Sequence, residues 1–212
     1  MTRFAVILPA GGVSSRFGSD KLDQQLGGMR VIDRTLAAFQ HRQDVVQIVV
    51  AGRELLGTTF APGGDSRAQS VRNALELMTP EIEWIAIHDA ARPLVSQDLI
   101  TRTLAAAGEH GAAGPALPVH LTIKQSTGAL PSKIERTLPR SQLWGMQTPQ
   151  IMRRIDLVEA FDRCPVPLDQ ITDDLQLLEL IGKPTWLVAG EERNLKITTP
   201  LDLVIARSFL SE

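Results

Sequence analysis

Residues 4–21, FAVILPAGGVSSRFGSDK, contain the pattern that decides the fold. The run from Phe4 to Leu8 is apolar at every position, which is typical of a strand buried on both faces of a parallel sheet. Small residues follow immediately, and they let the backbone N–H groups of the next loop approach an anion closely. Ligands of parallel sheets bind outside the carboxyl ends of the strands, so a binding site is expected first at this loop.

The rest of the chain alternates between apolar runs and segments of helical period, which predicts βαβ units. Further strands are expected at residues 45–50, 84–88, 113–119, 185–189 and 194–198. Helices are expected at 31–42, 67–78, 96–109, 149–163 and 172–181, with a last one opening at Thr199 and Pro200. The sequence therefore predicts an α/β protein, a Rossmann-like three-layer fold with a mostly parallel sheet in a single domain over residues 1–212.

Residues 120–143 interrupt this alternation. They are mostly polar, carry Gly128 and Pro131, and include scattered β-branched residues. The pattern predicts an excursion from the core, a hairpin arm that protrudes from the domain.

The composition of the 212 residues is that of an ordinary globular protein, with 43% hydrophobic and 22% charged residues. The net charge of −2 argues against general affinity for nucleic acid or anionic membranes, although a local basic pocket is compatible with it. Cys164 is the only cysteine, so neither an intrachain disulfide nor a cysteine-based zinc site can form. The N-terminal apolar run is too short for a signal peptide, and no stretch approaches the roughly 18 apolar residues of a membrane span. We therefore expect a cytoplasmic protein.

The loop after the first strand is the first candidate for phosphate binding. It is neither a Walker loop nor a dinucleotide fingerprint, and its glycines alone are equally compatible with a tight turn that serves packing. Two cationic side chains on the same loop favour phosphate binding. The groups concerned are the small residues Ala10, Gly11, Gly12 and Ser14 and the cations Arg16 and Lys21.

A second candidate is GGDSRAQSV, residues 63–71, between a predicted strand and a predicted helix. Asp65, Arg67 and Ser70 could contact a base or a ribose. The alternative is a loop in which Asp65 lies near a helix cap.

A third candidate is HDAARP, residues 88–93. Asp89 ends a predicted strand, where a carboxylate can bind a magnesium ion that bridges phosphate oxygens. Arg92 could bind a second phosphate with two parallel hydrogen bonds. The alternative is an internal Asp–Arg ion pair that stabilises a turn.

Three other features have simpler interpretations. His88 lies in an apolar strand and is interpreted as a core histidine. The run LWGMQTPQ, residues 143–150, is interpreted as a core aromatic residue followed by a helix start. Lys196 enters a predicted strand, where a lysine is usually exposed unless a phosphate lies nearby.

In this order along the chain, these segments resemble the 2-C-methyl-D-erythritol 4-phosphate cytidylyltransferase family of the non-mevalonate isoprenoid pathway. The resemblance covers essentially the whole chain and rests on LPAGGVSSRFG with Lys21, GGDSRAQSV, HDAARP, LTIK, LWGMQTPQ, TDD and NLKITTPLDL. It implies a nucleotidyltransferase fold and an enzyme that transfers CMP from CTP to 2-C-methyl-D-erythritol 4-phosphate. The products would be 4-diphosphocytidyl-2-C-methyl-D-erythritol and pyrophosphate.

The resemblance also implies a role for each matching residue. The catalytic cations would be Arg16, Lys21 and Lys196. CTP would be bound by Ala10, Gly11, Gly12 and Ser14, and its cytosine and ribose by Gly64, Asp65 and Ser70. Magnesium would be held by Asp89. The polyol phosphate would be bound by Arg92, Thr172 and Lys196, and also by Thr122 and Arg140 from the partner subunit's arm, which implies a homodimer with a composite site.

The reaction brings a phosphate dianion to an α-phosphorus that is already surrounded by negative oxygens. Catalysis therefore reduces to charge neutralisation and in-line positioning, without a side-chain nucleophile. Three alternatives stay open: a sister cytidylyltransferase for ribitol 5-phosphate, a non-catalytic nucleotide sensor on the same fold, and a guanylyl- or uridylyltransferase. Pyrophosphate release with each acceptor, and the thermal shift caused by each nucleotide, would separate them.

Overall fold

The computed structural model describes residues 2–11, 17–18 and 20–210 of the chain. Its centre is an eight-stranded sheet in the order β10-β7-β11-β6-β1-β4-β5, with β12 paired to β7. The strands are β1 (Phe4–Pro9), β4 (Val45–Ala51), β5 (Thr59–Ala61), β6 (Trp84–Ile87), β7 (Ala112–Pro118), β10 (Trp144–Met146), β11 (Gln150–Arg153) and β12 (Trp186–Ala189). Among these strands only β10 and β11 run opposite to the others, so the prediction of a mostly parallel sheet is confirmed.

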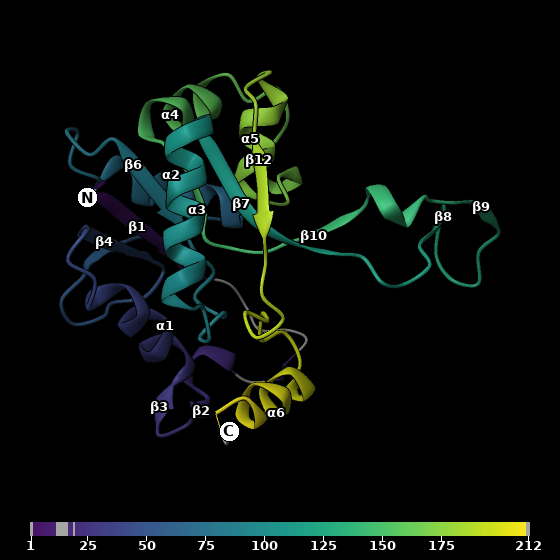
Figure 1. The fold of residues 1–212 in the computed structure, drawn as a ribbon, viewed down its shortest axis with the longest axis horizontal. Helices are drawn as coiled ribbons and strands as arrows, with labels where there is room; N and C mark the ends of the chain where they lie inside the picture. The colour runs from purple at the N-terminus through teal and green to yellow at the C-terminus, as the bar shows by residue number, and fades with distance from the viewer. Residues whose placement is uncertain (1, 12–16, 19, 211–212) are drawn as a thin grey trace.

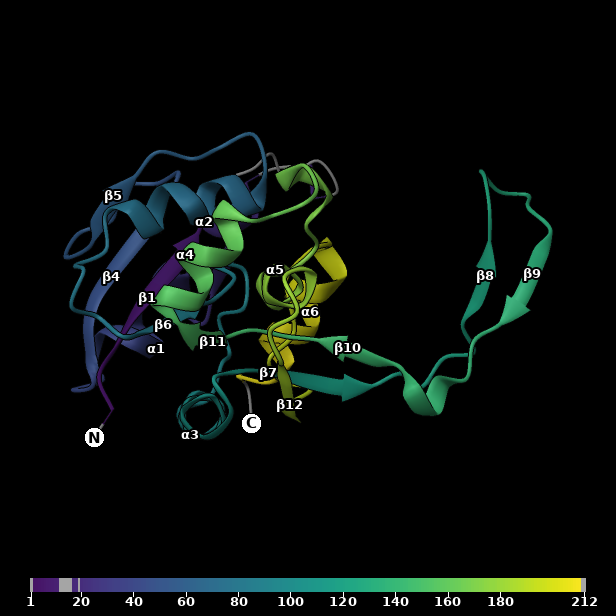
Figure 2. The ribbon, with the colours of Figure 1, turned by 90° about the horizontal axis from the view of Figure 1, so that it is seen from above.

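Helices cover both faces of this sheet (Figure 2). They are α1 (Val31–Gln40), α2 (Arg67–Glu76), α3 (Gln97–His110), α4 (Arg154–Asp162), α5 (Asp174–Leu180) and α6 (Pro200–Ser208). Phe4, Val6 and Leu8 of β1 pack into a core cluster with α1, α3 and α6. Ala5 and Ile7 point the other way, into a cluster with α2, α4 and α5. Successive side chains of a strand face opposite sides, and burial on both sides explains why this strand is apolar throughout.

The first residues of two helices, α2 and α5, place charged side chains at the carboxyl edge of the sheet. Ser66 caps α2 by accepting a hydrogen bond from the Gln69 N–H, and Asp173 caps α5 in the same way for Gln176. Arg67 and Asp174 are therefore the first residues of their helices.

Two sequence predictions of secondary structure are wrong. The helix expected from residue 149 begins only at Arg154, because the preceding residues form β11 between β6 and β7. Ile151 and Met152 are fully buried there, so strand pairing overrides the helical pattern. The segment 194–198, expected to be a strand, has no regular secondary structure, and the Ile197 N–H donates to the Ala91 carbonyl instead of to a neighbouring strand.

Smaller elements complete the chain (Figure 1). They are β2 (Gln25–Leu26), β3 (Met29–Arg30), β8 (Lys124–Ser126) and β9 (Ile134–Thr137), with short 3-10 helices η1 (Lys21–Asp23), η2 (Arg140–Gln142) and η3 (Leu168–Gln170). Among the described residues, no helix has both the length and the apolar character that a membrane crossing requires.

Strands β8 and β9 form a hairpin that projects from the body of the molecule (Figure 2). Almost all side chains of the hairpin and of the segment that leads into it are exposed, and three of them are large and apolar: Leu121, Leu130 and Ile134. This hairpin corresponds to the arm expected at residues 120–143. Its part in dimerisation, and the assignment of the whole chain to one domain, stay predictions.

Candidate active site

Three glycines let the loops after β1, β4 and β5 come into contact. Gly52 has a φ of +89°, and a Cβ there would lie 2.6 Å from the Gly11 Cα. A Cβ at Gly63 would lie 3.4 Å from the Gly52 Cα. The described start of the loop after β1, the candidate phosphate loop, is thus packed against two neighbouring strand ends, which determine its position.

We expect Gly52→Ala to lower the free energy of unfolding by roughly 2–4 kcal/mol, because the added methyl meets backbone atoms and the left-handed conformation is itself unfavourable. Gly57→Ala is the matched control, since Gly57 has a φ of +76° but its Cβ would contact only the end of the Gln40 side chain. Urea unfolding of both variants measures the difference. Equal losses would show that the contact with Gly11 is unimportant.

Two cavities lie at the carboxyl edge of the sheet and share a wall. The first, about 150 Å³, is lined by Pro9, Ala10, Gly11, Lys21, Leu22, Arg67, Asp89, Ala90, Ala91 and Lys196. The second, about 320 Å³, is lined by Arg67, Asp89, Arg92, Met146, Gln147, Thr148, Gln150, Thr172, Asp173 and Lys196. The shared residues are Arg67, Asp89 and Lys196. One cavity reaches the candidate phosphate loop and the other reaches the start of α5, so two ligands could meet at Asp89.

Asp89 is surrounded by cations. Its Oδ1 accepts a hydrogen bond of 3.0 Å from the Arg67 Nε, and its Oδ2 lies 3.0 Å from the Lys196 Nζ. The Arg92 Nε lies 3.5 Å from the same Oδ2. Burial alone would raise the pKa of this carboxyl, but the charges of Arg67, Lys196 and Arg92 outweigh burial and hold the pKa well below its usual range. Asp89 is therefore ionised at any physiological pH.

Arg67 joins Asp89 to a second carboxylate. Its Nη1 and Nη2 donate to the two oxygens of Asp174 at 2.9 and 2.8 Å, while its Nε is bonded to Asp89. Burial lowers the pKa of Arg67, but the two carboxylates raise it by more, so the guanidinium stays charged. The Asp174 side chain is fully buried.

Arg92, on the wall of the second cavity, is held by two backbone carbonyls. Its Nη1 donates to the Asn194 carbonyl at 2.7 Å, and its Nη2 to the Met146 carbonyl at 3.3 Å. The Gln147 amide reinforces the same region by donating to the Glu191 carbonyl and accepting from the Glu191 N–H. These bonds attach the segment that carries Lys196 to the sheet.

His88 orients the backbone at Asp89 from the interior of the protein. A carbonyl can only accept, so the His88 Nε2 carries the proton and donates to the Arg92 carbonyl at 3.1 Å. Its Nδ1 then accepts from the Thr148 hydroxyl, whose oxygen in turn accepts from the Asp89 N–H at 3.0 Å. The prediction of a core histidine fits its complete burial.

Burial lowers the pKa of His88 to about 4, despite the opposing effects of the Arg92 carbonyl and Asp89. The unfolded chain binds this proton below its ordinary pKa of about 6.5, whereas the folded protein does so only near pH 4. Protonation of His88 therefore does not lower the free energy of unfolding above about pH 6.5. As the pH falls from 6.5 towards 4, it lowers that free energy by about 3 kcal/mol. We expect His88→Gln to flatten this part of the pH dependence in urea unfolding, and an unchanged slope would contradict the assignment.

The structure brings some of the predicted site residues together and leaves others apart. Those that line the two cavities are Ala10, Gly11, Lys21, Asp89, Arg92, Thr172 and Lys196. Gly12, Ser14 and Arg16 lie outside the described residues.

The second candidate segment, residues 63–71, begins at Gly63, one of the three glycines that let the loops come into contact. Ser70 is buried there, and its hydroxyl accepts from the Gly64 N–H at 2.9 Å, which fixes the loop that exposes Asp65. Thr122 and Arg140 are on the projecting arm and line neither cavity. Within one chain, these two residues are not part of the site.

Sequence reasoning misses two features of the site. The motif around Arg67 suggests a contact to base or ribose, but the folded chain directs this side chain to Asp89 and Asp174. From the sequence, Asp174 is only an acid in the first turn of a helix, a position that is commonly acidic for local reasons. The sequence carries no signal that pairs two residues 107 positions apart.

Asp89 is the described carboxylate that lines both cavities, and it is the candidate ligand for a divalent metal in this site. Among the residues that the structure describes, no group of three or more His, Cys, Asp or Glu side chains is arranged to hold a metal. Mg²⁺ needs fewer, because it commonly takes one or two carboxylates and completes its shell with phosphate oxygens and water. An ionised Asp89 on the wall of both cavities fits that requirement.

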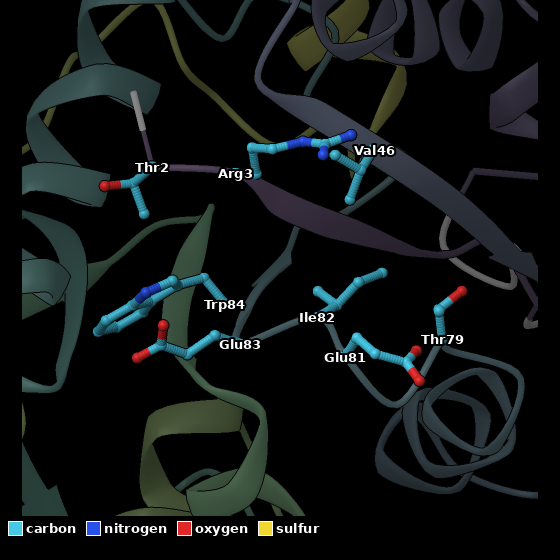
Figure 3. Close-up of a pocket in the computed structure, with 8 residues that line it drawn as sticks. All are labelled: Thr2, Arg3, Val46, Thr79, Glu81, Ile82, Glu83 and Trp84. Atoms are coloured by element: carbon cyan, nitrogen blue, oxygen red, sulfur yellow. The ribbon is translucent and has the colours of Figure 1, made fainter.

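A larger hollow of about 650 Å³ lies elsewhere, at the amino ends of β1, β4 and β6 (Figure 3). Its lining includes the carboxylates of Glu81 and Glu83 and the guanidinium of Arg3. That charge balance does not suit a phosphate ligand.

Comparison with known proteins decides the family. The sequence profile of IspD, 2-C-methyl-D-erythritol 4-phosphate cytidylyltransferase, matches residues 4–212. The chain belongs to the 2-C-methyl-D-erythritol 4-phosphate cytidylyltransferase family. The predicted resemblance and the predicted enzyme class are thereby confirmed.

The matches to relatives cover nearly the whole of this chain. The cytidylyltransferase of Pelotomaculum thermopropionicum is 35% identical, and the match covers 99% of this chain and 95% of that protein. A bifunctional enzyme IspD/IspF of Desulfotalea psychrophila is 34% identical, but the chain spans only 58% of its length. The crystal structure of the cytidylyltransferase from Thermus thermophilus superposes with a TM-score of 0.83 at 36% identity, covering all of both chains. The fold is therefore that of this family of nucleotidyltransferases.

Proposed function

We propose that the chain transfers CMP from CTP to 2-C-methyl-D-erythritol 4-phosphate, which gives 4-diphosphocytidyl-2-C-methyl-D-erythritol and pyrophosphate in isoprenoid precursor synthesis. The observation that carries the proposal is the wall shared by the two cavities, where Arg67, Asp89 and Lys196 meet. The cavity at the phosphate loop suits the triphosphate, and the cavity at Arg92 and Thr172 suits the acceptor. Family membership supplies the identity of the two substrates.

The chemistry follows from the charges. The acceptor phosphate attacks the α-phosphorus of CTP, the bond to the β-phosphate oxygen breaks, and pyrophosphate leaves. Lys196 and Lys21 stabilise negative charge that accumulates on the phosphoryl oxygens, while Arg92 orients the attacking phosphate. Asp89 would hold Mg²⁺, which when bound neutralises phosphate oxygens.

A direct assay tests this proposal. Pyrophosphate release is measured with CTP and either 2-C-methyl-D-erythritol 4-phosphate or ribitol 5-phosphate, with GTP and UTP in place of CTP, and with and without Mg²⁺. We expect release with CTP, the methylerythritol phosphate and Mg²⁺. Faster turnover of ribitol 5-phosphate would reassign the acceptor, and no release with any pair would leave a nucleotide-binding protein.

The arm supports a homodimer in which each site is completed by the other subunit. Thr122 and Arg140 are exposed and lie apart from the cavities of their own chain. The exposed apolar residues on the arm are an added reason to expect a partner surface. The single cysteine is consistent with a reducing, cytoplasmic setting.

Mixing two inactive variants tests the shared site. We expect Arg140→Ala and Lys196→Ala to be impaired separately, and their unfolded and refolded 1:1 mixture to recover roughly a quarter of wild-type activity, since half of the dimers are mixed and each has one intact site. Sedimentation velocity checks the dimer. A mixture no more active than its parts would show that Arg140 serves its own chain.

A further inference from the structure

We propose that Asp174, acting through Arg67, is a positioning residue that holds the Asp89 carboxylate in its working orientation. The inference rests on the proposed function. It starts from the contact already described, in which one guanidinium joins two carboxylates from different parts of the chain. Asp89 follows β6, whereas Arg67 and Asp174 begin α2 and α5.

The geometry divides the donors of Arg67 between the two carboxylates. Asp174 accepts from both Nη atoms, so only Nε remains directed at Asp89, and it reaches only Oδ1. The other oxygen of Asp89, Oδ2, is not bonded to Arg67 and faces Lys196 at the shared wall of the cavities. Without Asp174, the two Nη donors would be free to turn to Asp89 and bind both of its oxygens, because a guanidinium and a carboxylate favour that paired arrangement.

The position of Asp174 is itself fixed. Its side chain is fully buried, and its backbone N–H donates to the Gln150 Oε1 at 2.8 Å. The neighbouring Leu175 N–H donates to the same oxygen at 3.0 Å. Gln150 belongs to β11, so the carboxylate that controls Arg67 is anchored to the central sheet.

A second Arg–Asp pair, away from the site, serves as a control that distinguishes an effect on positioning from an effect on stability. Arg42 donates to both oxygens of Asp44 at 2.9 and 2.7 Å, and the two side chains are only 9% and 2% exposed. This pair lies at the start of β4, at the amino edge of the sheet, and lines neither cavity. Asp44→Asn and Arg42→Lys therefore make the same chemical changes as Asp174→Asn and Arg67→Lys without reaching Asp89.

Two measurements test the inference. The first is kcat and KM for each substrate. The second is the affinity of the Mn²⁺–CTP complex, measured without acceptor from the enzyme-dependent change of the Mn²⁺ electron paramagnetic resonance signal. We expect Asp174→Asn and Arg67→Lys to lower kcat by about 10–100-fold and to weaken Mn²⁺–CTP binding about tenfold, with KM for the polyol phosphate little changed. Asp174→Glu keeps the carboxylate and is expected to recover part of both losses.

The control variants are expected to lower the melting temperature while kcat and Mn²⁺–CTP affinity stay at wild-type values. Folded Asp174→Asn and Arg67→Lys proteins that match these controls would overturn the inference. If Asp174→Asn does not fold, Arg67→Lys decides, because it keeps the positive charge and loses only the simultaneous reach to both carboxylates. A wild-type protein without pyrophosphate release would contradict the proposed function instead, and Mn²⁺–CTP binding would still decide the role of Asp174.

Discussion

Replacing Lys196 by alanine is expected to lower kcat for CMP transfer by roughly 10²–10³-fold. The Lys196 ammonium lies 3.0 Å from Asp89 on the wall between the two cavities, where the α-phosphorus would be attacked. Its charge is most valuable when the phosphoryl oxygens carry the greatest negative charge, so the loss should fall on kcat more than on KM for CTP. Steady-state pyrophosphate release measures both constants.

Lys183→Ala is the control for this experiment. Lys183 likewise forms ion pairs, with Asp156 and Glu159, but it lines neither cavity. Its loss is expected to leave kcat unchanged. Near-normal turnover in Lys196→Ala would remove Lys196 from the mechanism.

Asp89→Asn is expected to cause a loss of roughly 10³-fold in kcat, together with a lower melting temperature. The variant retains the cations of Arg67, Arg92 and Lys196 but lacks the charge that holds them together. It also lacks the described carboxylate that fits Mg²⁺. Adding Mg²⁺ to high concentration is therefore expected to restore little activity.

Asp98→Asn is the control for Asp89→Asn. The Asp98 side chain pairs with Arg102 but is 82% exposed, so its removal is expected to change neither activity nor melting temperature measurably. Pyrophosphate release over a range of Mg²⁺ concentrations, with thermal unfolding of each variant, makes the comparison. Wild-type kcat in Asp89→Asn would exclude a direct role for this carboxylate.

Elements with a local pattern can be predicted from the sequence. The apolar run of β1, the helical period of α1 and the cap of α6 each depend on residues close together in the chain, and each lies where its pattern predicts. β11 could not be predicted, because its burial depends on β6 and β7 pairing with it from both sides. The expected core aromatic, Trp144, is half exposed on β10 for the same reason: its surroundings are set by tertiary pairing.

The site shows the same division. Lys21 and Asp89 can be found from short local motifs and Lys196 from the family resemblance, and all three line the cavities. The partners that hold Asp89 cannot be found in this way. Arg67 and Asp174 each have an ordinary local interpretation at a helix start, and only the folded chain brings them into contact.

The charge distribution determines whether the protein attracts its substrates over long distances. The described lining of the cavities carries the cations Lys21, Arg67, Arg92 and Lys196 against the acids Asp89 and Asp173, yet the whole chain has a net charge of −2. Screening confines such a local excess to about 8 Å at physiological ionic strength, so a distant polyanion feels no attraction. Added salt is therefore expected to raise the dissociation rate of CTP from the cavity and to leave its association rate almost unchanged. In an enzyme that attracts its ligand over long distances, salt would instead lower the association rate.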